Sequence, residues 1–497
     1  MAIDKTLGVA LSGGGHRASI FGLGALLYLV DAERHSRLTA VSSVSGGSIT
    51  NAFIGQHCDL ATVTQAEFDV VAAKFVRTIM NRGVLEHWVT VLYLGLMVAF
   101  AVFIAATWIW SFPIAIPTTY SILAVVLLGV ALIFRGVVVD YVFGMLFFAA
   151  DGRQSTLEDL DRTAGHIFCA TNITDGAPLY FLGWKTGYIY SHTLGLAKAG
   201  KTRLRTAVRA SAALPGAFPP KRLHTGRYRF TRHQIPVEDL PESVYLADGG
   251  VWNNLGDQWF DEVNEVWEVS LEMSMKGPSL EDRSKWPGIR VDEVLVVDAS
   301  APLKETSNRL FAIPFLGEIA SLSRSLGLVY FNSVQPRVSS INTKLLHSRM
   351  IVGSQFGDRA VASMTESPGY FAAEFIPRST SLLHEVTDDT ERRAHQLMQY
   401  LDELTENIYI PESHLEGSEV LRDLSDFCAQ TPTTLSRFDA ETTLALLVNG
   451  YLAAMEVCHV VFDYPLVPLA LERFHRLLPE HRAIRGPRAW LFESNAV

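Results

Sequence analysis

Two stretches near the start of the chain decide the fold: LGVALSGGGHR over residues 7–17 and LTAVSSVSGG over residues 38–47. Each begins with a short apolar run of the length of a buried strand and continues through glycines into a sequence of helical character. A strand, a glycine turn and a helix repeated in this way predict an α/β fold, with a sheet covered by helices on both faces.

Later stretches extend this pattern. Further runs of strand length are His166–Thr171, Leu179–Leu182, Val244–Ala247 and Val294–Asp298, and a helix is predicted at Thr202–Ala213. From about Phe371 onward, leucines repeat at helical spacing, and Asp439 is the predicted N-cap of a helix that contains Leu444 and Met455. We therefore expect an α/β core followed by a helical C-terminal region.

The loop Ser12-Gly13-Gly14-Gly15-His16-Arg17 separates the first strand from the first helix. Three glycines expose backbone N–H groups at a helix N-terminus, an arrangement that binds anions. Gly13-x-Gly15-x-x-Ala18 also fits a loose dinucleotide fingerprint, which expects a carboxylate at the tip of the next strand. Residues 42–45 contain no carboxylate. The glycines alone leave a dinucleotide site and an oxyanion hole equally open.

The second turn, Ser43-Val44-Ser45-Gly46-Gly47, matches the serine elbow G-x-S-x-G except that Ser43 replaces the first glycine. Such an elbow needs small neighbours, because the strand and the helix approach closely around the nucleophile. The pattern predicts that Ser45 presents its hydroxyl at the carboxyl edge of the sheet, beside the glycine loop. This position favours the oxyanion hole.

A third motif, Asp248-Gly249-Gly250, follows the strand predicted at Val244–Ala247. By itself an Asp-Gly-Gly sequence is usually a turn. A serine hydroxyl, however, needs an adjacent base to become a good nucleophile. Together with the elbow, the motif therefore makes Asp248 the candidate base for Ser45.

In this order, the glycine loop, the serine elbow and the Asp-Gly-Gly turn resemble those of the patatin-like phospholipase family. Further matching stretches are CATN at residues 169–172 with Asp175-Gly176, AVRASAALPGAFPP at residues 207–220, and DGGVWNNL at residues 248–255. The resemblance covers about residues 5 to 350, interrupted by one apolar insertion. It implies a patatin-like three-layer α/β/α hydrolase core, with no metal and no organic cofactor.

The resemblance also implies a Ser–Asp dyad without a catalytic histidine, in which Ser45 is the nucleophile and Asp248 the general base. Arg17 matches the arginine that follows the family's glycine loop and is expected to orient that loop. Ala18 stands where the family often has glycine, and His16 is expected to be a spectator. The backbone amides implied as the oxyanion hole are those of Gly13, Gly14 and Gly15.

The apolar insertion runs from Trp88 to Phe134 without a charged residue. Prolines divide it into segments of about 24 and about 17 residues, which as helices fall within the range that spans a bilayer. A buried helical pair in a soluble core is the alternative to this transmembrane hairpin. The next stretch, Gly136–Ala150, contains Asp140 and is predicted to be an interfacial or core helix.

Charge and composition indicate the compartment and exclude some functions. Arg82 and Arg135 flank the hairpin while its turn is uncharged, which predicts cytoplasmic termini and a cytoplasmic catalytic domain. Four scattered cysteines fit a reducing compartment, and no residues have metal-site spacing. A net charge of −10 argues against a nucleic-acid-binding surface.

The sequence therefore predicts a membrane-anchored lipid acyl hydrolase of the phospholipase A type, with membrane phospholipid as its substrate. Its expected parts are the first part of the catalytic domain at 1–84, the hairpin at 85–135, the second part of the catalytic domain at 136–370 and the helical region at 371–497. The helical region is a candidate for regulation, or for binding a partner or a second copy. The alternatives are a lipid transacylase with the same dyad and a catalytically silent membrane scaffold.

Overall fold

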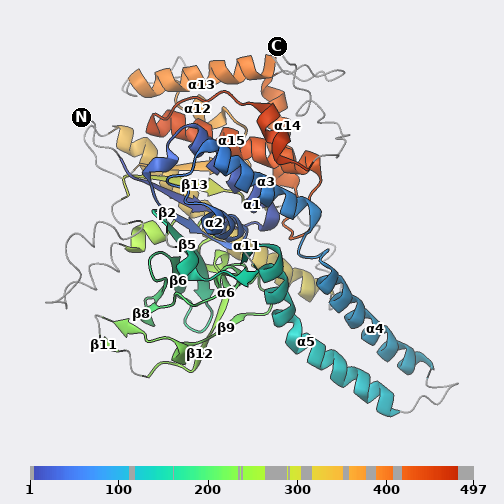
Figure 1. Ribbon diagram of the computed structural model, residues 1–497. Helices are drawn as coiled ribbons and strands as arrows, with labels where there is room; N and C mark the ends of the chain where they lie inside the picture. Colours follow the sequence, from blue (N-terminus) through green and yellow to red (C-terminus); the bar gives the residue numbers. More distant parts are fainter. Residues whose placement is uncertain are drawn as a thin grey trace.

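A mixed sheet with helices on both faces forms the centre of the molecule (Figure 1). The computed structural model describes residues 5–110, 118–150, 152–160, 162–232, 235–236, 239–263, 288, 291–300, 302–303, 316–350, 358–376, 388–406 and 417–479. The predicted α/β fold class is confirmed.

Among the described residues, five strands form the parallel part of the sheet. In spatial order they are β5 (Gly165–Asn172), β2 (Leu38–Ser43), β1 (Leu7–Leu11), β13 (Glu293–Asp298) and β14 (Asp358–Ser363). Side chains alternate along these strands, so Val9 and Leu11 join one hydrophobic core and Ala10 joins the other. The first core includes α1 (Gly15–Asp31) and α2 (Ser45–His57), and the second includes α11 (Leu316–Met350).

An antiparallel part continues the sheet beyond β5. It consists of β6 (Pro178–Gly183), β7 (Tyr188–Ser191), β8 (Gly195–Lys198), β10 (Thr231–Arg232) and β11 (Ile235–Pro236). Short connections between β5, β6, β7 and β8 permit hairpins and hence antiparallel pairing. Strand β12 (Ser243–Asp248) pairs antiparallel with β5 and with β9 (Lys221–His224), and β3 (Ala149–Ala150) pairs with β4 (Arg153–Gln154).

The C-terminal helices pack onto the α/β body mainly through α15 (Ala440–Phe462), which contacts α1, β13 and β14. The other C-terminal helices are α12 (Tyr370–Ala373), α13 (Asp388–Glu406), α14 (Gly417–Gln430) and α16 (Leu471–Leu477). As predicted, Asp439 caps α15 by accepting a hydrogen bond from the N–H of Thr442 at 2.7 Å. Helix α15 lies against α1, and 94% of its most apolar window is buried inside the protein. It is therefore a core helix, although its length and composition would suit a membrane span.

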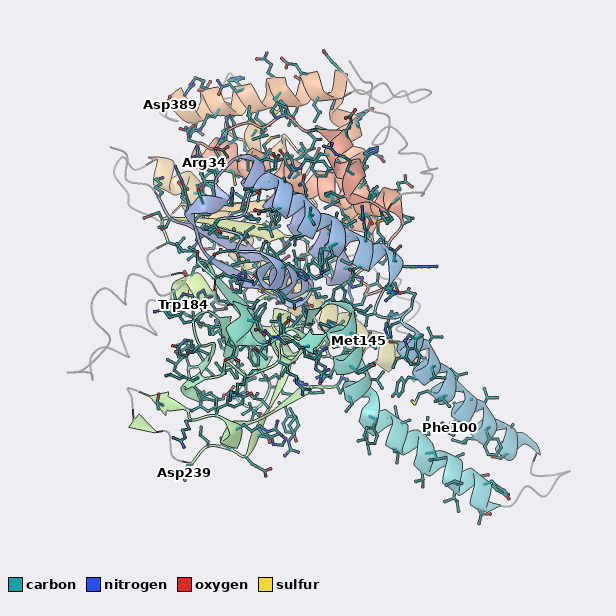
Figure 2. The ribbon with its side chains drawn as sticks, in the orientation of Figure 1. Arg34, Phe100, Met145, Trp184, Asp239 and Asp389 are labelled. Carbon is teal, nitrogen blue, oxygen red and sulfur yellow. The ribbon has the colours of Figure 1, made fainter. Side chains whose placement is uncertain are left out.

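Two helices, α4 (Trp88–Trp110) and α5 (Thr118–Leu146), project from the body of the molecule after α3 (Gln65–Asn81), as Figures 1 and 2 show. Both are long and apolar enough to cross a membrane, with mean hydropathies of 2.5 and 2.8 and at most 6% of their windows buried. Apolar side chains such as Leu92 and Ile133 are exposed along them. An exposed apolar surface of this extent marks a contact with lipid or protein.

The stretch Gly136–Ala150 is helical up to Leu146 and reaches the core, as predicted, but it continues α5 and does not form a separate helix. Helix α5 continues without a break to Leu146 through Gly136 and Gly144, and no proline interrupts it after Thr118. Its last turns enter the main body, where Val142 and Phe143 are fully buried. The end of α5 is thus part of the core, and α5 joins the apolar projection rigidly to it.

Candidate active site

The ends of β2 and β12 meet on the same side of β5. Strand β2 runs parallel to β5 and its last residue, Ser43, is paired with Phe168. Strand β12 runs in the opposite direction, and its last residue, Asp248, is paired with Ala170. The carboxyl ends of β2 and β12 therefore face each other, on either side of the position of Cys169 in β5. This pairing brings together residues that lie about two hundred positions apart in the sequence.

Ser45 lies on a strained turn between β2 and α2. Its φ of 49° is in the left-handed region that few non-glycine residues adopt, as expected for a serine elbow. The Ser45 N–H donates to the hydroxyl of Ser211, at the end of α6 (Leu204–Ser211), with a distance of 3.0 Å. A Cβ on Gly46 would lie only 2.0 Å from the carbonyl oxygen of Gly15, so this glycine lets the elbow touch the glycine loop.

Asp248 is buried and fixed through both its backbone and its side chain. Its carboxylate accepts a hydrogen bond from the N–H of Gly250 at 2.8 Å, in the short helix α7 (Gly250–Asn253). The hydroxyls of Ser45 and Tyr330 also interact with this carboxylate, in a looser geometry than the Gly250 amide. Burial raises the pKa of Asp248 to about 6, and these three interactions lower it in part. The group is therefore mostly ionised at neutral pH.

The three glycines of the loop differ in their hydrogen bonding. The N–H of Gly13 donates to the carbonyl oxygen of Asn254 at 3.0 Å, so it is already occupied. In the part of the chain that the structure describes, the N–H groups of Gly14 and Gly15 have no acceptor. A Cβ on Gly13 would lie 3.2 Å from the Cβ of Ser45. Gly13 thus allows the loop to lie close to Ser45, whereas the N–H groups of Gly14 and Gly15 are available to bind an anion.

Arg17 is buried and holds two segments beside the glycine loop. Its guanidinium donates to the carbonyl oxygens of Ala299 and Thr431, both at 2.8 Å. The neighbouring His16 donates its backbone N–H to Thr434, and its ring hydrogen-bonds the carbonyl oxygen of Ser436. Burial lowers the pKa of His16 to about 4, so its ring is neutral at physiological pH.

Two residues near Ser45 and Asp248 were not predicted from the sequence. Ser211, which accepts from the Ser45 N–H, lies within the matching stretch at residues 207–220 but carries no signal of its own. Tyr330 comes from α11, and its ring lies against Gly250. A Cβ added to Gly250 would lie only 2.4 Å from this ring. Only the packing of α11 on the Asp-Gly-Gly turn places the Tyr330 hydroxyl near Asp248.

The two asparagines after the turn make hydrogen bonds to residues beyond it. The side chain of Asn253 accepts from the N–H of Leu255 and donates to Asp257, so it shapes the next turn of the chain. Asn254 binds the glycine loop through its carbonyl oxygen and donates its amide to Ser300. Together they fix the segment after Asp248 against the first strand.

A partly exposed serine on a strained elbow, a buried aspartate and free loop amides define the class of α/β serine acyl hydrolases. Residues 9–256 match the family model described as patatin-like phospholipase. Through these residues the chain belongs to the patatin-like phospholipase family, as predicted. The sheet extends beyond the matched residues, because β13 and β14 complete its parallel edge.

Two solved structures are similar to this chain at low identity. Human GIVD cytosolic phospholipase A2 is 11% identical with a TM-score of 0.40, and the match covers 91% of this chain and 59% of that chain. VipD from Legionella pneumophila is 13% identical with a TM-score of 0.26, and the match covers 100% and 93% of the two chains. No curated protein matches this chain significantly.

Proposed function

We propose that this protein is a membrane-anchored serine hydrolase of the phospholipase A type, which cleaves fatty-acyl esters of membrane phospholipids. The observation that carries the proposal is the meeting of Ser45 and Asp248 at the facing ends of β2 and β12. The free N–H groups of Gly14 and Gly15 beside Ser45 support it.

In the first half of the proposed reaction, the Ser45 hydroxyl attacks the ester carbonyl carbon while Asp248 accepts its proton. The amides of Gly14 and Gly15 donate to the oxyanion that develops, and each such donor typically stabilises the transition state by ~3–4 kcal/mol. When the tetrahedral intermediate collapses, the C–O bond to the lysolipid breaks. The leaving oxygen takes the proton from Asp248, and the acyl group remains on Ser45.

In the second half, Asp248 removes a proton from water, which attacks the acyl-enzyme. The ester bond to Ser45 breaks, Asp248 returns the proton to the Ser45 oxygen, and the free fatty acid leaves. A base with a pKa of about 6 suits this task, because it is ionised at neutral pH yet accepts a proton readily.

The helices α4 and α5 are proposed as the membrane anchor, with both termini on the cytoplasmic side. Their exposed apolar surfaces and the flanking Arg82 and Arg135 support this placement. The anchor holds the hydrolase at its substrate, since the lipid is then present at high local concentration.

The proposal is tested by measuring fatty-acid release from phosphatidylcholine vesicles by purified, reconstituted protein. Ser45→Ala and Asp248→Asn should each lower the rate by about ten-thousandfold or more, because one lacks the nucleophile and the other the base. Ser36→Ala, which changes an exposed serine, is the matched control and should retain the rate. Hydrolysis that persists in Ser45→Ala would overturn the mechanism.

A further inference from the structure

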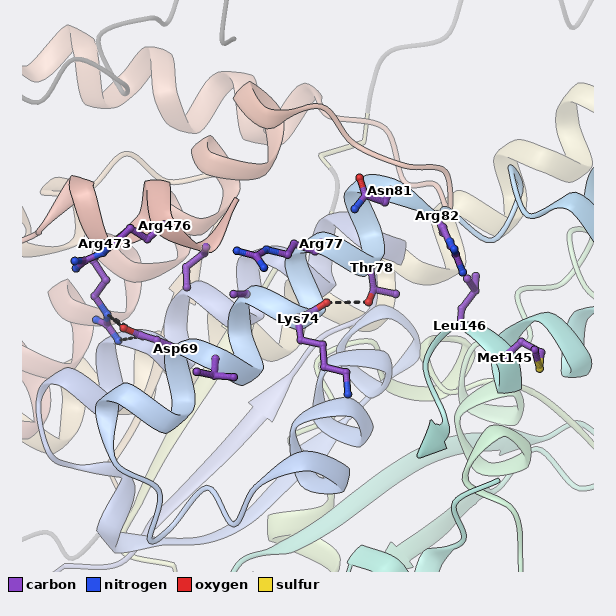
Figure 3. Close-up of a pocket in the computed structure, with 13 residues that line it drawn as sticks. Asp69, Lys74, Arg77, Thr78, Asn81, Arg82, Met145, Leu146, Arg473 and Arg476 are labelled. Carbon is purple, nitrogen blue, oxygen red and sulfur yellow. Dashed lines mark hydrogen bonds and ion pairs between the residues drawn. The ribbon is translucent and has the colours of Figure 1, made fainter. Parts of the chain in front are cut away.

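A cavity lies along α3, away from the Ser45 site. It has a volume of about 730 Å³ and is walled by α3, α16 and the end of α5 (Figure 3). None of the residues proposed for catalysis lines it. Its size is in the range of cavities that bind small molecules and headgroups.

The cavity is strongly basic in an acidic protein. Its lining cations are Lys74, Arg77, Arg82, Arg473 and Arg476, and its lining carboxylate is Asp69. The whole chain has 52 acidic and 42 basic residues, so an excess of cations in one concave site is contrary to the overall charge. Such an excess in a cleft attracts anions.

The lining carboxylate, Asp69, already has a partner. Arg473 is buried and donates to Asp69 at 2.6 Å and also pairs with Asp31 of α1, so it fastens α16 to α1 and α3. The other cations are more accessible: Lys74, Arg77, Arg82 and Arg476 are exposed. The Lys74 ammonium lies 2.8 Å from Nε2 of His57, which holds its position without a negative charge.

The basic cavity begins at the root of the apolar hairpin. Arg82 precedes the first residue of α4 by six positions, and Met145 and Leu146 form the last turn of α5. Figure 3 shows Arg82, Met145 and Leu146 at one end of the cavity and Arg476 at the other. The cavity therefore has an apolar wall next to the hairpin, formed by Met145 and Leu146, and its cations extend along α3 away from the hairpin.

We propose that this cavity binds the headgroup of an anionic phospholipid that carries a phosphomonoester, at a site separate from the catalytic one. Arg82, beside Met145 and Leu146, binds the phosphate oxygens by charge-assisted hydrogen bonds, and Arg77 adds positive charge farther along α3. The lipid chains descend beside Met145 along the hairpin. The cavity would thereby couple the protein to membranes of a particular charge. The inference uses the membrane position of the hairpin from the proposed function, but it does not depend on catalysis.

The test measures binding to the full-length, detergent-solubilised protein by calorimetry. All variants carry Ser45→Ala, so that no probe is hydrolysed. The probes are short-chain phosphatidic acid, short-chain phosphatidylcholine and inorganic phosphate. The double variant Arg77→Gln/Arg82→Gln is compared with Arg392→Gln/Arg422→Gln, which removes the same charge from exposed positions on α13 and α14.

Phosphatidic acid should bind at least about tenfold more weakly to the Arg77/Arg82 variant than to the control variant. Phosphatidylcholine should not distinguish the two. Equal binding of phosphatidic acid to both variants would overturn the proposal. If inorganic phosphate bound as tightly as phosphatidic acid, the proposal of a lipid ligand would be wrong, and the site would bind free phosphate. Because Ser45→Ala is used throughout, an inactive enzyme would leave these outcomes unchanged.

Discussion

Arg209 and Ser211 lie two residues apart on α6 and join the root of the hairpin to the serine elbow. The guanidinium of Arg209 pairs with Asp140 of α5 at 3.3 Å, and the hydroxyl of Ser211 accepts from the N–H of Ser45. One short helix thus contacts both the helix proposed to enter the membrane and the proposed nucleophile. Helix α6 therefore connects the root of the hairpin to the elbow through two polar contacts.

Asp140→Asn should destabilise the protein, because Asp140 pairs with both Arg209 and Lys221. Without the carboxylate, two largely buried cations face each other uncompensated. We expect a loss of about 2–4 kcal/mol in the free energy of unfolding, somewhat reduced because Asp140 is partly exposed. Denaturant unfolding in detergent measures it. Asp389→Asn, at an exposed ion pair, should change stability by less than about 0.5 kcal/mol, and an equal effect of both would refute the argument.

The pH dependence of hydrolysis should follow the ionisation of Asp248. Since the base must be deprotonated, the rate should rise as the pH increases through about 6 and level off above it. Rates measured over a pH series with a fixed lipid substrate test this. A rate independent of pH across this interval would contradict the role of Asp248.

Tyr330→Phe should shift this pH profile to higher pH. The Tyr330 hydroxyl is one of the groups that lower the pKa of Asp248, so its loss should raise that pKa. Activity should then fall near pH 6 and recover at higher pH. The exposed Tyr370→Phe is the control. A uniform loss of activity at every pH would instead indicate a structural role for Tyr330.

Gly24→Ala should destabilise the contact between α1 and α15. A Cβ at this position would lie 2.2 Å from the carbonyl oxygen of Leu447, which is backbone and cannot rotate away. We expect a cost of about 1–3 kcal/mol despite the better helix propensity of alanine. A Cβ at Gly22, on the same helix, would lie 3.4 Å from the Leu11 side chain, which is an ordinary contact. Gly22→Ala should therefore be neutral or stabilising. Thermal unfolding of the two variants compares them, and similar melting temperatures would refute this account.

Replacing Trp88–Phe134 with a short glycine–serine linker should release the protein from membranes. The remaining end of α5 keeps its core contacts through Val142 and Phe143, so the body should stay folded. Fractionation with an alkaline carbonate wash measures the distribution, and circular dichroism checks folding. The full-length protein should resist the wash. Its extraction by carbonate would contradict the membrane hairpin.

Much of the local structure could be predicted from the sequence because it depends on short-range patterns. Strand β1 has the bounds expected from its apolar run, and the aspartate cap of α15 was evident from residue type. The short strands β7 to β11 were not predicted, since few residues define each one and pairing determines them. Strand β14 was missed for the same reason: its position beside β13 depends on partners distant in sequence.

The sequence by itself determined which chemical groups are present: a serine between small residues, three successive glycines, an Asp-Gly-Gly turn and an uncharged apolar insertion. Only the tertiary structure decided how they are used. It occupies the Gly13 amide with Asn254, brings Tyr330 over the aspartate and joins the hairpin root to the elbow through α6. These relationships depend on strand pairing and helix packing between distant segments, which no local pattern encodes.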